Sequence, residues 1–467
     1  MKRMSFGDMR NLLCRLVMFV MALGFVACSD DDDPVLPSNE GEEMAEYTIM
    51  LYGCGGGDLD ETMIANLEEA ELVGSDDKVK MTCQVKFSEA YQSVPELSGT
   101  RRFVLDENGD GESDDEVVMD ASLPLYDPAN LADFIRWSKE KCPAKNYILV
   151  LWNHGGGWYP ATDMPKTKAV IFDDNVGNLA LSLDELVAGV KQSDTHLKML
   201  YYDACLMGML ENYAGLTEIT DYVLGSAHSV PGLGGNYTSL IENLRETADF
   251  EEAISRYVHE VVSIWGVAGD VCDLGLADLS ALPNVLSVVK TCADRLVETY
   301  EDNQEMYDAA TDYCYRFDNT YSSFDIENYV QLLANFSNDP ELIGYAARLQ
   351  RAFDNMFVYQ ELSRDLVSEG MSISLGVTLI ENGRWMRGNG TFLDWDGSIT
   401  DDKGNVLVAS WGSTGDDTYG QLAFDQATGW SRWLKLNQQL PTNNPGPSDD
   451  DDDDDDHPEG DVVDGNE

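Results

Sequence analysis

The stretch LKMLYYDAC, residues 197–205, sets the fold because it is an almost unbroken apolar run that ends on an acid and a thiol. Such runs are typical of central strands in a parallel sheet, which helices cover on both faces. Similar runs predict strands at residues 47–53, 78–87, 146–155, 168–174, 197–205 and 221–229. Helical patterns lie between them, at residues 61–72, 129–142, 182–192 and 206–216. This alternation predicts an α/β fold with a largely parallel sheet flanked by helices.

Polar clusters follow three of these strands, and functional groups in parallel α/β sheets gather at the carboxyl ends of strands. The clusters are NHGGG (153–157), DAC (203–205) and SAHS (226–229). Cys205 stands at the junction with a predicted helix, whose N-terminus would favour a thiolate. An imidazole close by, such as that of His154, would complete an activated nucleophile.

Each residue alone has a structural explanation, since a lone cysteine is usually a small buried hydrophobe and a lone histidine a satisfied strand end. Together they indicate chemistry. A histidine followed by glycines, with a cysteine about fifty residues downstream, has the order and spacing of Cys/His enzymes of the caspase type. The pair therefore predicts a catalytic Cys205 and His154.

Charge excludes one large class of partner. The 467 residues carry 30 basic and 85 acidic side chains, a formal net charge of −55. Nucleic-acid binding depends on clustered Lys and Arg, which are scarce here, so we expect no nucleic-acid partner. The composition favours cationic partners.

The N-terminus resembles a targeting segment. Basic residues precede an apolar run at 16–27 that is too short to span a bilayer comfortably, and Cys28 follows at once. This arrangement resembles a bacterial lipobox, although Phe25 replaces the usual aliphatic residue. The acidic stretch at 29–33 resembles the export tag of surface lipoproteins. We expect an exported protein anchored through a lipid on Cys28, at the outer membrane and cell surface of a bacterium; plain secretion is the alternative.

Nine cysteines occur in the sequence, and seven lie beyond Cys28. That number is odd, so at least one thiol is left over in an exported protein, whatever the state of the other six. No paired CxxC occurs, which argues against a zinc ribbon or a thioredoxin-type redox site. No HExxH or GxSxG motif is present either.

The motifs YILVLWNHGGGW (147–158) and YYDACLMGMLE (201–211) resemble those of the clostripain family of cysteine peptidases, relatives of gingipains, legumains and caspases. Weaker similarity extends over most of residues 47–435. The resemblance implies a caspase-like fold and endopeptidase activity after Arg or Lys on peptide or protein substrates. It implies Cys205 as nucleophile and His154 as general base and acid. The N–H groups of Gly155 and Cys205 would form the oxyanion hole.

Substrate binding is implied for Asp203, which matches the family acid beside the pocket for a basic side chain; the alternative is a strand-end acid that caps a helix. The segment 225–237 departs from the family pattern, because His228 stands where an acid is expected. His228 could line the pocket or compete with His154 as the base. His196, His259 and His457 are expected to lie elsewhere.

Some family members cleave themselves between the histidine and the cysteine. The corresponding loop here carries Lys166 and Lys168, and we predict cleavage after Lys168, with Lys166 next; an exposed lysine pair without this role is the alternative. Some relatives use calcium, and the acidic body permits it, but no EF-hand spacing occurs and no cofactor is required.

The predicted organisation is a lipoprotein signal peptide (1–27), an acidic tether (28–46), a caspase-like catalytic domain (47–268), a mainly helical C-terminal domain carrying a few strands (269–440) and a disordered acidic tail (441–467). Late strands are expected at 371–380 and 405–411, and the protein is expected to be monomeric. A second hypothesis is a catalytically silent surface lipoprotein that binds cationic peptides or host proteins.

Overall fold

The computed structural model describes residues 44–55, 59–88, 99–105, 116–160, 168–173, 179–317, 323–379, 385–386, 392–393, 399–400, 406–408, 419–434 and 436–437. The predicted signal peptide, Cys28, the acidic tether up to residue 43 and the acidic tail lie outside these residues.

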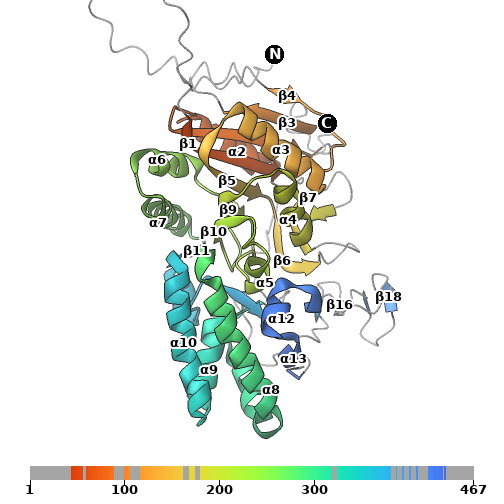
Figure 1. The fold of residues 1–467 in the computed structure, drawn as a ribbon, viewed down its shortest axis with the longest axis vertical. Helices are drawn as coiled ribbons and strands as arrows, with labels where there is room; N and C mark the ends of the chain where they lie inside the picture. The colour runs from red at the N-terminus through yellow and green to blue at the C-terminus, as the bar shows by residue number, and fades with distance from the viewer. Residues whose placement is uncertain are drawn as a thin grey trace, which may run out of the picture.

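A nine-stranded sheet forms the centre of the molecule (Figure 1), with the strand order β13-β11-β10-β9-β5-β1-β2-β3-β4. The five strands from β10 to β2 run parallel, and antiparallel strands extend the sheet on both sides. The prediction of a largely parallel α/β sheet is confirmed. The strands are β1 (Ala45–Cys54), β2 (Val79–Phe87), β3 (Gly99–Val104), β4 (Val117–Val118), β5 (Ala144–Trp152), β9 (Leu197–Asp203), β10 (Thr220–Gly225), β11 (Asp273–Asp278) and β13 (Phe357–Leu362).

Both faces of the sheet are buried, which explains why its strands are apolar without alternation. Ile49 and Leu51 of β1 pack in one hydrophobic cluster with α2 (Asp60–Glu71), α6 (Tyr237–Glu246) and α7 (Phe250–Ala268). Met50 and Tyr52 point to the other face and pack with α3 (Pro128–Lys141) and α4 (Leu183–Gln192). Successive side chains of a strand alternate between the faces, so each face has its own core.

Local sequence defines where the covering helices begin. The Asp127 carboxylate accepts a hydrogen bond from the Ala129 N–H at 2.8 Å, and Pro128 takes the first helical position of α3. Ser182 and Glu185 form a reciprocal capping box at the start of α4. These contacts satisfy N–H groups that a helix leaves without partners in its first turn.

A smaller antiparallel sheet stands beside the central one. It contains β6 (Gly155–Pro160), β7 (Lys168–Asp173) and β8 (Leu179–Leu181), in that order. The predicted strand at 168–174 therefore forms, but it pairs outside the central sheet. Asp173 at the end of β7 makes an ion pair with Lys86 of β2 at 2.6 Å, and both side chains are fully buried. This pair ties the small sheet to the large one.

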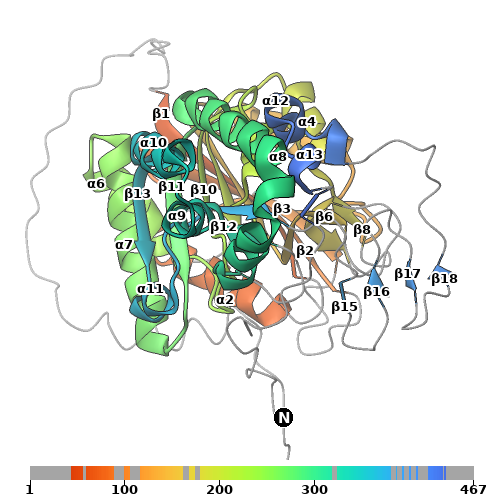
Figure 2. The same ribbon diagram turned by 90° about the horizontal axis from the view of Figure 1, so that it is seen from below.

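The C-terminal half is mainly helical, as predicted, and Figure 2 shows its three long helices beside one another. The central sheet nevertheless crosses the expected boundary at 268/269, because β11 and β13 belong to it. The remaining elements are η3 (Leu279–Ala281), α8 (Leu282–Tyr313), β12 (Ser323–Asp325), α9 (Ile326–Phe336), α10 (Pro340–Met356), α11 (Arg364–Glu369), β14 (Gly376–Thr378), β15 (Trp385–Met386), β16 (Phe392–Leu393), β17 (Ile399–Thr400), β18 (Val406–Val408), η4 (Tyr419–Gln421), α12 (Ala423–Thr428) and α13 (Ser431–Leu434).

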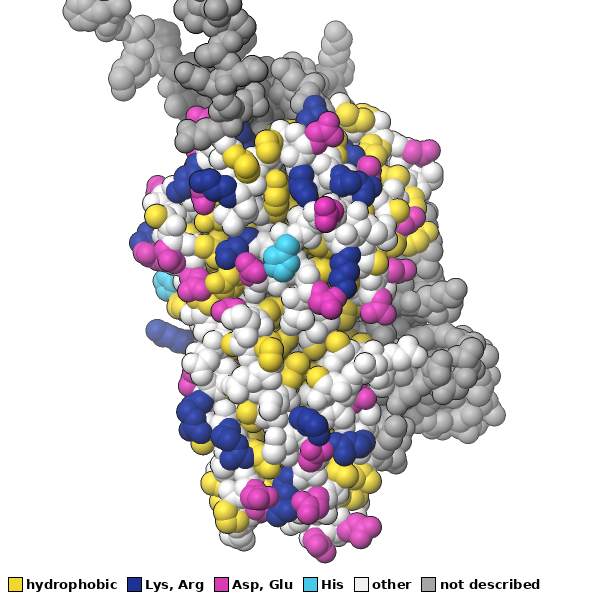
Figure 3. Space-filling model, viewed as in Figure 1, with side chains coloured by type: hydrophobic (Ala, Val, Ile, Leu, Met, Phe, Trp, Pro, Cys, Tyr) yellow, Lys and Arg dark blue, Asp and Glu magenta, His cyan; other side chains and the backbone are white. Residues whose placement is uncertain are grey.

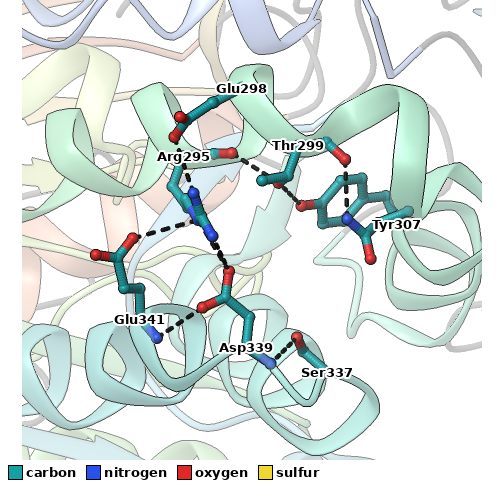
Figure 4. A network of polar contacts seen from close by, with 8 residues as sticks. Arg295, Glu298, Thr299, Tyr307, Ser337, Asp339 and Glu341 are labelled. Atoms are coloured by element: carbon teal, nitrogen blue, oxygen red, sulfur yellow. Dashed lines mark hydrogen bonds and ion pairs between the residues drawn. The ribbon is translucent and has the colours of Figure 1, made fainter.

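An arginine-centred network joins two of the long helices (Figure 4). Arg295 of α8 donates to the Asp339 carboxylate at 2.8 and 2.6 Å, and Asp339 is the residue that caps α10. Glu298 lies one turn away and accepts from Arg295 at 2.9 Å. This half-exposed network sets the position of α10 against α8.

The surface mixes both signs of charge on the face drawn in Figure 3, where basic and acidic side chains are interspersed and apolar side chains lie between them. Within the residues that the structure describes, no helix combines the length and the apolar character needed to cross a bilayer.

Replacing Asp173 with alanine should lower the free energy of unfolding by about 3–5 kcal/mol, because Lys86 would remain buried without its carboxylate. The paired change Lys86→Met with Asp173→Leu should cost much less, since no uncompensated charge remains. Lys290→Ala is the control, because its pair with Asp294 is exposed and should be worth less than about 1 kcal/mol. Urea denaturation measures all three; equal losses in the single and paired variants would contradict the argument.

Candidate active site

Parallel pairing of β5 with β9 brings two of the predicted clusters to one edge of the sheet. Trp152 lies opposite Asp203, and the Asn153 N–H donates to the Asp203 carbonyl at 3.3 Å. His154 and Cys205 each follow two residues after this last pair. Both therefore leave the sheet side by side, at the carboxyl ends of adjacent strands.

Gly155 is in direct contact with the backbone of Cys205. A Cβ atom at Gly155 would lie 2.1 Å from the Cys205 carbonyl oxygen and 3.0 Å from its nitrogen. No side chain fits in that space, so glycine is required for this approach. The contact brings the backbone beside His154 against that of the predicted nucleophile.

Accessibility singles out Cys205 among the thiols that the structure describes. None of these seven cysteines forms a disulfide, and six of them are buried, whereas Cys205 is partly exposed and His154 is exposed. Burial raises the pKa of Cys272 and of Cys292 to about 12, and that of Cys83 and Cys314 well above the usual value. These thiols are poor nucleophiles, since the thiolate is the reactive form.

Asn153, which precedes His154, is fixed by two elements. Its amide nitrogen donates to the Cys54 carbonyl at the end of β1, and its amide oxygen accepts from the Phe172 N–H of β7; both distances are 2.6 Å. The side chain is buried. The strand end that carries His154 is thus held from both the central and the small sheet.

The helix expected directly after Cys205 is not there. Its place is taken by α5 (Leu210–Ala214), which has five residues and begins one full turn later. Leu206 has a positive φ of 61°, a backbone conformation that a helix does not allow. The predicted support of the thiolate by a helix N-terminus was therefore wrong.

A loop supplies the N–H group instead. Residues 226–236, hereafter the Cys205-facing loop, cross in front of the thiol. The Val230 N–H donates to the Cys205 sulfur at 3.3 Å, and the Val230 carbonyl lies 3.8 Å from the same sulfur. The sequence did not single out Val230, because a main-chain donor leaves no signal in residue type.

Hydrogen bonds fasten the far end of this loop. Asn66 donates to the Leu233 carbonyl at 3.0 Å, and the Trp265 indole donates to the Gly234 carbonyl at 2.9 Å. The Trp152 indole in turn donates to Asn66 at 2.9 Å. The loop is thereby tied to the strand that carries His154.

Asp203 lies beside the nucleophile but beneath the loop, with 4% of its surface exposed. Its carboxylate accepts from the Tyr237 hydroxyl at 2.7 Å and from the Gly235 N–H at 2.9 Å. Burial raises the pKa of Asp203 to about 6, although both hydrogen bonds oppose the shift. The Glu69 carboxylate accepts a hydrogen bond from the Tyr237 N–H at 2.6 Å, and its pKa is raised to about 7, mainly by burial.

The other predicted residues occupy distinct places. Both ring nitrogens of His228 are buried within the Cys205-facing loop, and the described part of the chain offers them no hydrogen-bond partner. His196 pairs with Asp221 at 2.9 Å on the exposed amino-end side of the sheet. Lys168 is the first residue of β7, opposite Pro160. Lys166 lies outside the described residues.

No metal cluster marks this edge of the sheet in the part of the chain that the structure describes. The described residues contain no group of three or more His, Cys, Asp or Glu side chains that could hold a metal ion. A cavity of about 660 Å³ lies at the amino ends of β1, β2 and β5, between Lys78, Lys80, Lys141 and Lys145. It is at the opposite end of the strands from Cys205.

Known proteins are similar to this chain in sequence and in fold. The chain is 25% identical to clostripain of Hathewaya histolytica over 226 residues, which are 43% of this chain and 42% of that protein. A secreted C11 cysteine protease from Bacteroides thetaiotaomicron has a TM-score of 0.55 at 17% identity, covering 82% of this chain and 99% of the other. Its complex with an irreversible peptide inhibitor gives 0.57 at 14% identity, with coverages of 83% and 99%.

An inactive zymogen C11 protease from Parabacteroides distasonis has a TM-score of 0.52 at 15% identity, covering 87% of this chain and all of the other. At such identities these structures show a shared fold. The profile of the clostripain family matches residues 87–435, which include His154 and Cys205. The chain therefore belongs to the clostripain family of cysteine peptidases.

Proposed function

We propose that this protein is a cysteine endopeptidase in which Cys205 and His154 form the catalytic dyad. The observation that carries the proposal is the contact of Gly155 with the Cys205 backbone. This contact places the exposed His154 next to Cys205, which among the described cysteines is the one that is not buried. Family membership supports the same chemistry.

His154 takes the proton from the Cys205 thiol, and the thiolate attacks the carbonyl carbon of the scissile peptide bond. The N–H groups of Gly155 and Cys205 stabilise the oxyanion of the tetrahedral intermediate, a contribution usually worth several kcal/mol. His154 then gives its proton to the leaving amine, which breaks the C–N bond and leaves a thioester. Water activated by His154 hydrolyses the thioester and restores the thiol.

Replacing Cys205 or His154 with alanine should reduce kcat/KM on peptide substrates by at least about a thousandfold, because the dyad acts as a unit. His196→Ala is the matched control, as its imidazole is exposed and remote from the thiol, and it should retain full activity. The wild type should also react with iodoacetamide at Cys205 faster than at the six buried thiols. If no peptide is cut and Cys205 labels no faster, the silent binding protein is the correct hypothesis.

For the substrate, we propose a basic side chain that pairs with Asp203, as in the family pattern. The proposal is supported by the position of Asp203 two residues before the nucleophile; among the described residues, its carboxylate accepts from the Gly235 N–H and the Tyr237 hydroxyl and has no cationic partner. The ring of His228, whose two nitrogens are buried and have no hydrogen-bond partner in the described chain, would line the same pocket from the loop. A positional-scanning peptide library gives the preference directly.

Basic preference should weaken on acidification, because Asp203, with a pKa of about 6, loses its charge as the pH falls through that value. The ratio of kcat/KM for a Lys or Arg substrate to that for a Gln substrate should fall up to about tenfold between pH 7 and pH 5. The ratio cancels the titration of the dyad, which affects both substrates.

Two variants sharpen this pH measurement. Asp203→Asn should give a low ratio at every pH, whereas Glu69→Gln should keep the wild-type dependence although Glu69 also titrates near neutrality. A wild-type ratio that stays constant from pH 7 to pH 5 would exclude Asp203 as the charge that selects the substrate.

We also propose self-cleavage after Lys168, with Lys166 as the secondary site. The position of Lys168 as the first residue of β7 supports this, because residues up to Asp173 would stay bound through Phe172 and Asp173 after a cut. Mass spectrometry of the purified wild type should find the cut chain, while Cys205→Ala should stay intact. An intact chain in both the wild type and Cys205→Ala would contradict self-cleavage, and a cut chain in both would show that another protease makes the cut.

A further inference from the structure

Asp273 is a buried carboxylate at the start of β11 that collects four hydrogen bonds. One oxygen accepts from the Ser226 hydroxyl at 2.7 Å and from the His228 N–H at 3.0 Å. The other accepts from the Ala227 N–H at 2.9 Å and from the Ser374 hydroxyl. Three of the four donors are consecutive residues, the first three of the Cys205-facing loop.

The opposite side of these three residues is bonded to the segment that follows the nucleophile. The Leu206 N–H donates to the His228 carbonyl at 2.9 Å, and the Gly208 N–H donates to the Ser226 carbonyl at 2.7 Å. The approach is close, since a Cβ at Gly208 would lie 2.8 Å from the Ala227 nitrogen. Residues 226–228 are therefore held between Asp273 and the backbone next to Cys205.

Val230 follows two residues after His228, and its N–H reaches the Cys205 sulfur. With α5 beginning only at Leu210, this N–H provides the donor that a helix N-terminus was expected to give. A hydrogen bond of this kind strengthens when the sulfur becomes negative, provided that the donor stays in place. The position of Val230 depends on the anchored residues just before it.

We propose that Asp273 is a positioning residue for Cys205: it anchors residues 226–228 so that the Val230 N–H stays directed at the sulfur. The importance of this for catalysis rests on the proposed function, in which Cys205 is the nucleophile. Ser374 bonds to the same carboxylate from the C-terminal half, and its N–H donates to Gln360 of β13 at 2.9 Å. The C-terminal half thereby takes part in setting the nucleophile.

The test uses Asp273→Asn, which keeps the shape of the side chain but replaces one acceptor oxygen with a donor group. Alkylation of Cys205 by iodoacetamide in the folded full-length protein should slow about tenfold at pH 7.5, and kcat should fall with it while KM changes less. Asp325→Asn is the matched control. Asp325 is also a buried carboxylate, bonded to the N–H groups of Asn328, Ser372 and Ile373, and its loss should leave alkylation within twofold of the wild type.

A second pair of variants applies if Asp273→Asn does not fold. Ser226→Ala and Ser374→Ala each remove one hydroxyl from Asp273, but only Ser226 belongs to the loop. Ser226→Ala should slow alkylation at least twofold more than Ser374→Ala does. The proposal would be overturned if Ser226→Ala and Ser374→Ala slow alkylation equally, or if Asp273→Asn is alkylated within twofold of the wild-type rate. It would also be overturned if Asp325→Asn slows alkylation as much as Asp273→Asn does, or if Asp273→Asn changes only KM.

The alkylation readout needs no peptidase activity, so it separates the two proposals. If Cys205→Ala still cuts peptides, the proposed function fails, and the iodoacetamide rates still decide whether Asp273 sets the sulfur. If Cys205→Ala is inactive and Asp273→Asn alkylates normally, the dyad stands and the positioning role fails.

Discussion

The register between β5 and β9 is the constraint on which the rest of the site depends. Because Trp152 lies opposite Asp203, the chain segments that follow β5 and β9 leave the sheet at the same level along the strands. Gly155 can then touch the Cys205 backbone, so that the residue next to His154 lies against the nucleophile. A slip of one residue in this pairing would turn every side chain of one strand to the other face, which two separate cores forbid. The two hydrophobic cores thus protect the geometry of a polar site.

Much of this was predictable from the sequence, because the relevant signals are local. The parallel strands are apolar runs, and their carboxyl ends are marked by His154, Cys205 and the glycines beside them. What failed was the first turn of the helix predicted at 206–216, since α5 begins only at Leu210. Its composition favours a helix, but Leu206 takes a positive φ and Gly208 packs against Ala227, so contacts distant in sequence override the local preference.

Asp273 and Val230 show a different limit of prediction. Asp273 follows a cysteine in an ordinary strand sequence, and two of its four partners are main-chain N–H groups from a loop 45 and 46 residues earlier. Residue type does not encode such a partner; only the pairing of β10 with β11 brings the two together. The same pairing explains why the sheet continues past residue 268, since β11 and β13 were hidden among helical patterns.

The six buried cysteines have a consequence for how the protein withstands heat and denaturant. None of the described thiols forms a disulfide, so this part of the chain owes its stability to packing, hydrogen bonds and ion pairs. Unfolding in an oxidising medium exposes these thiols together with Cys205. Any two of them can then join, and most of the resulting pairs are incompatible with this fold. Recovery of the native state is therefore expected to require a reductant, and without one the lifetime of the protein is set by its rate of unfolding rather than by an equilibrium.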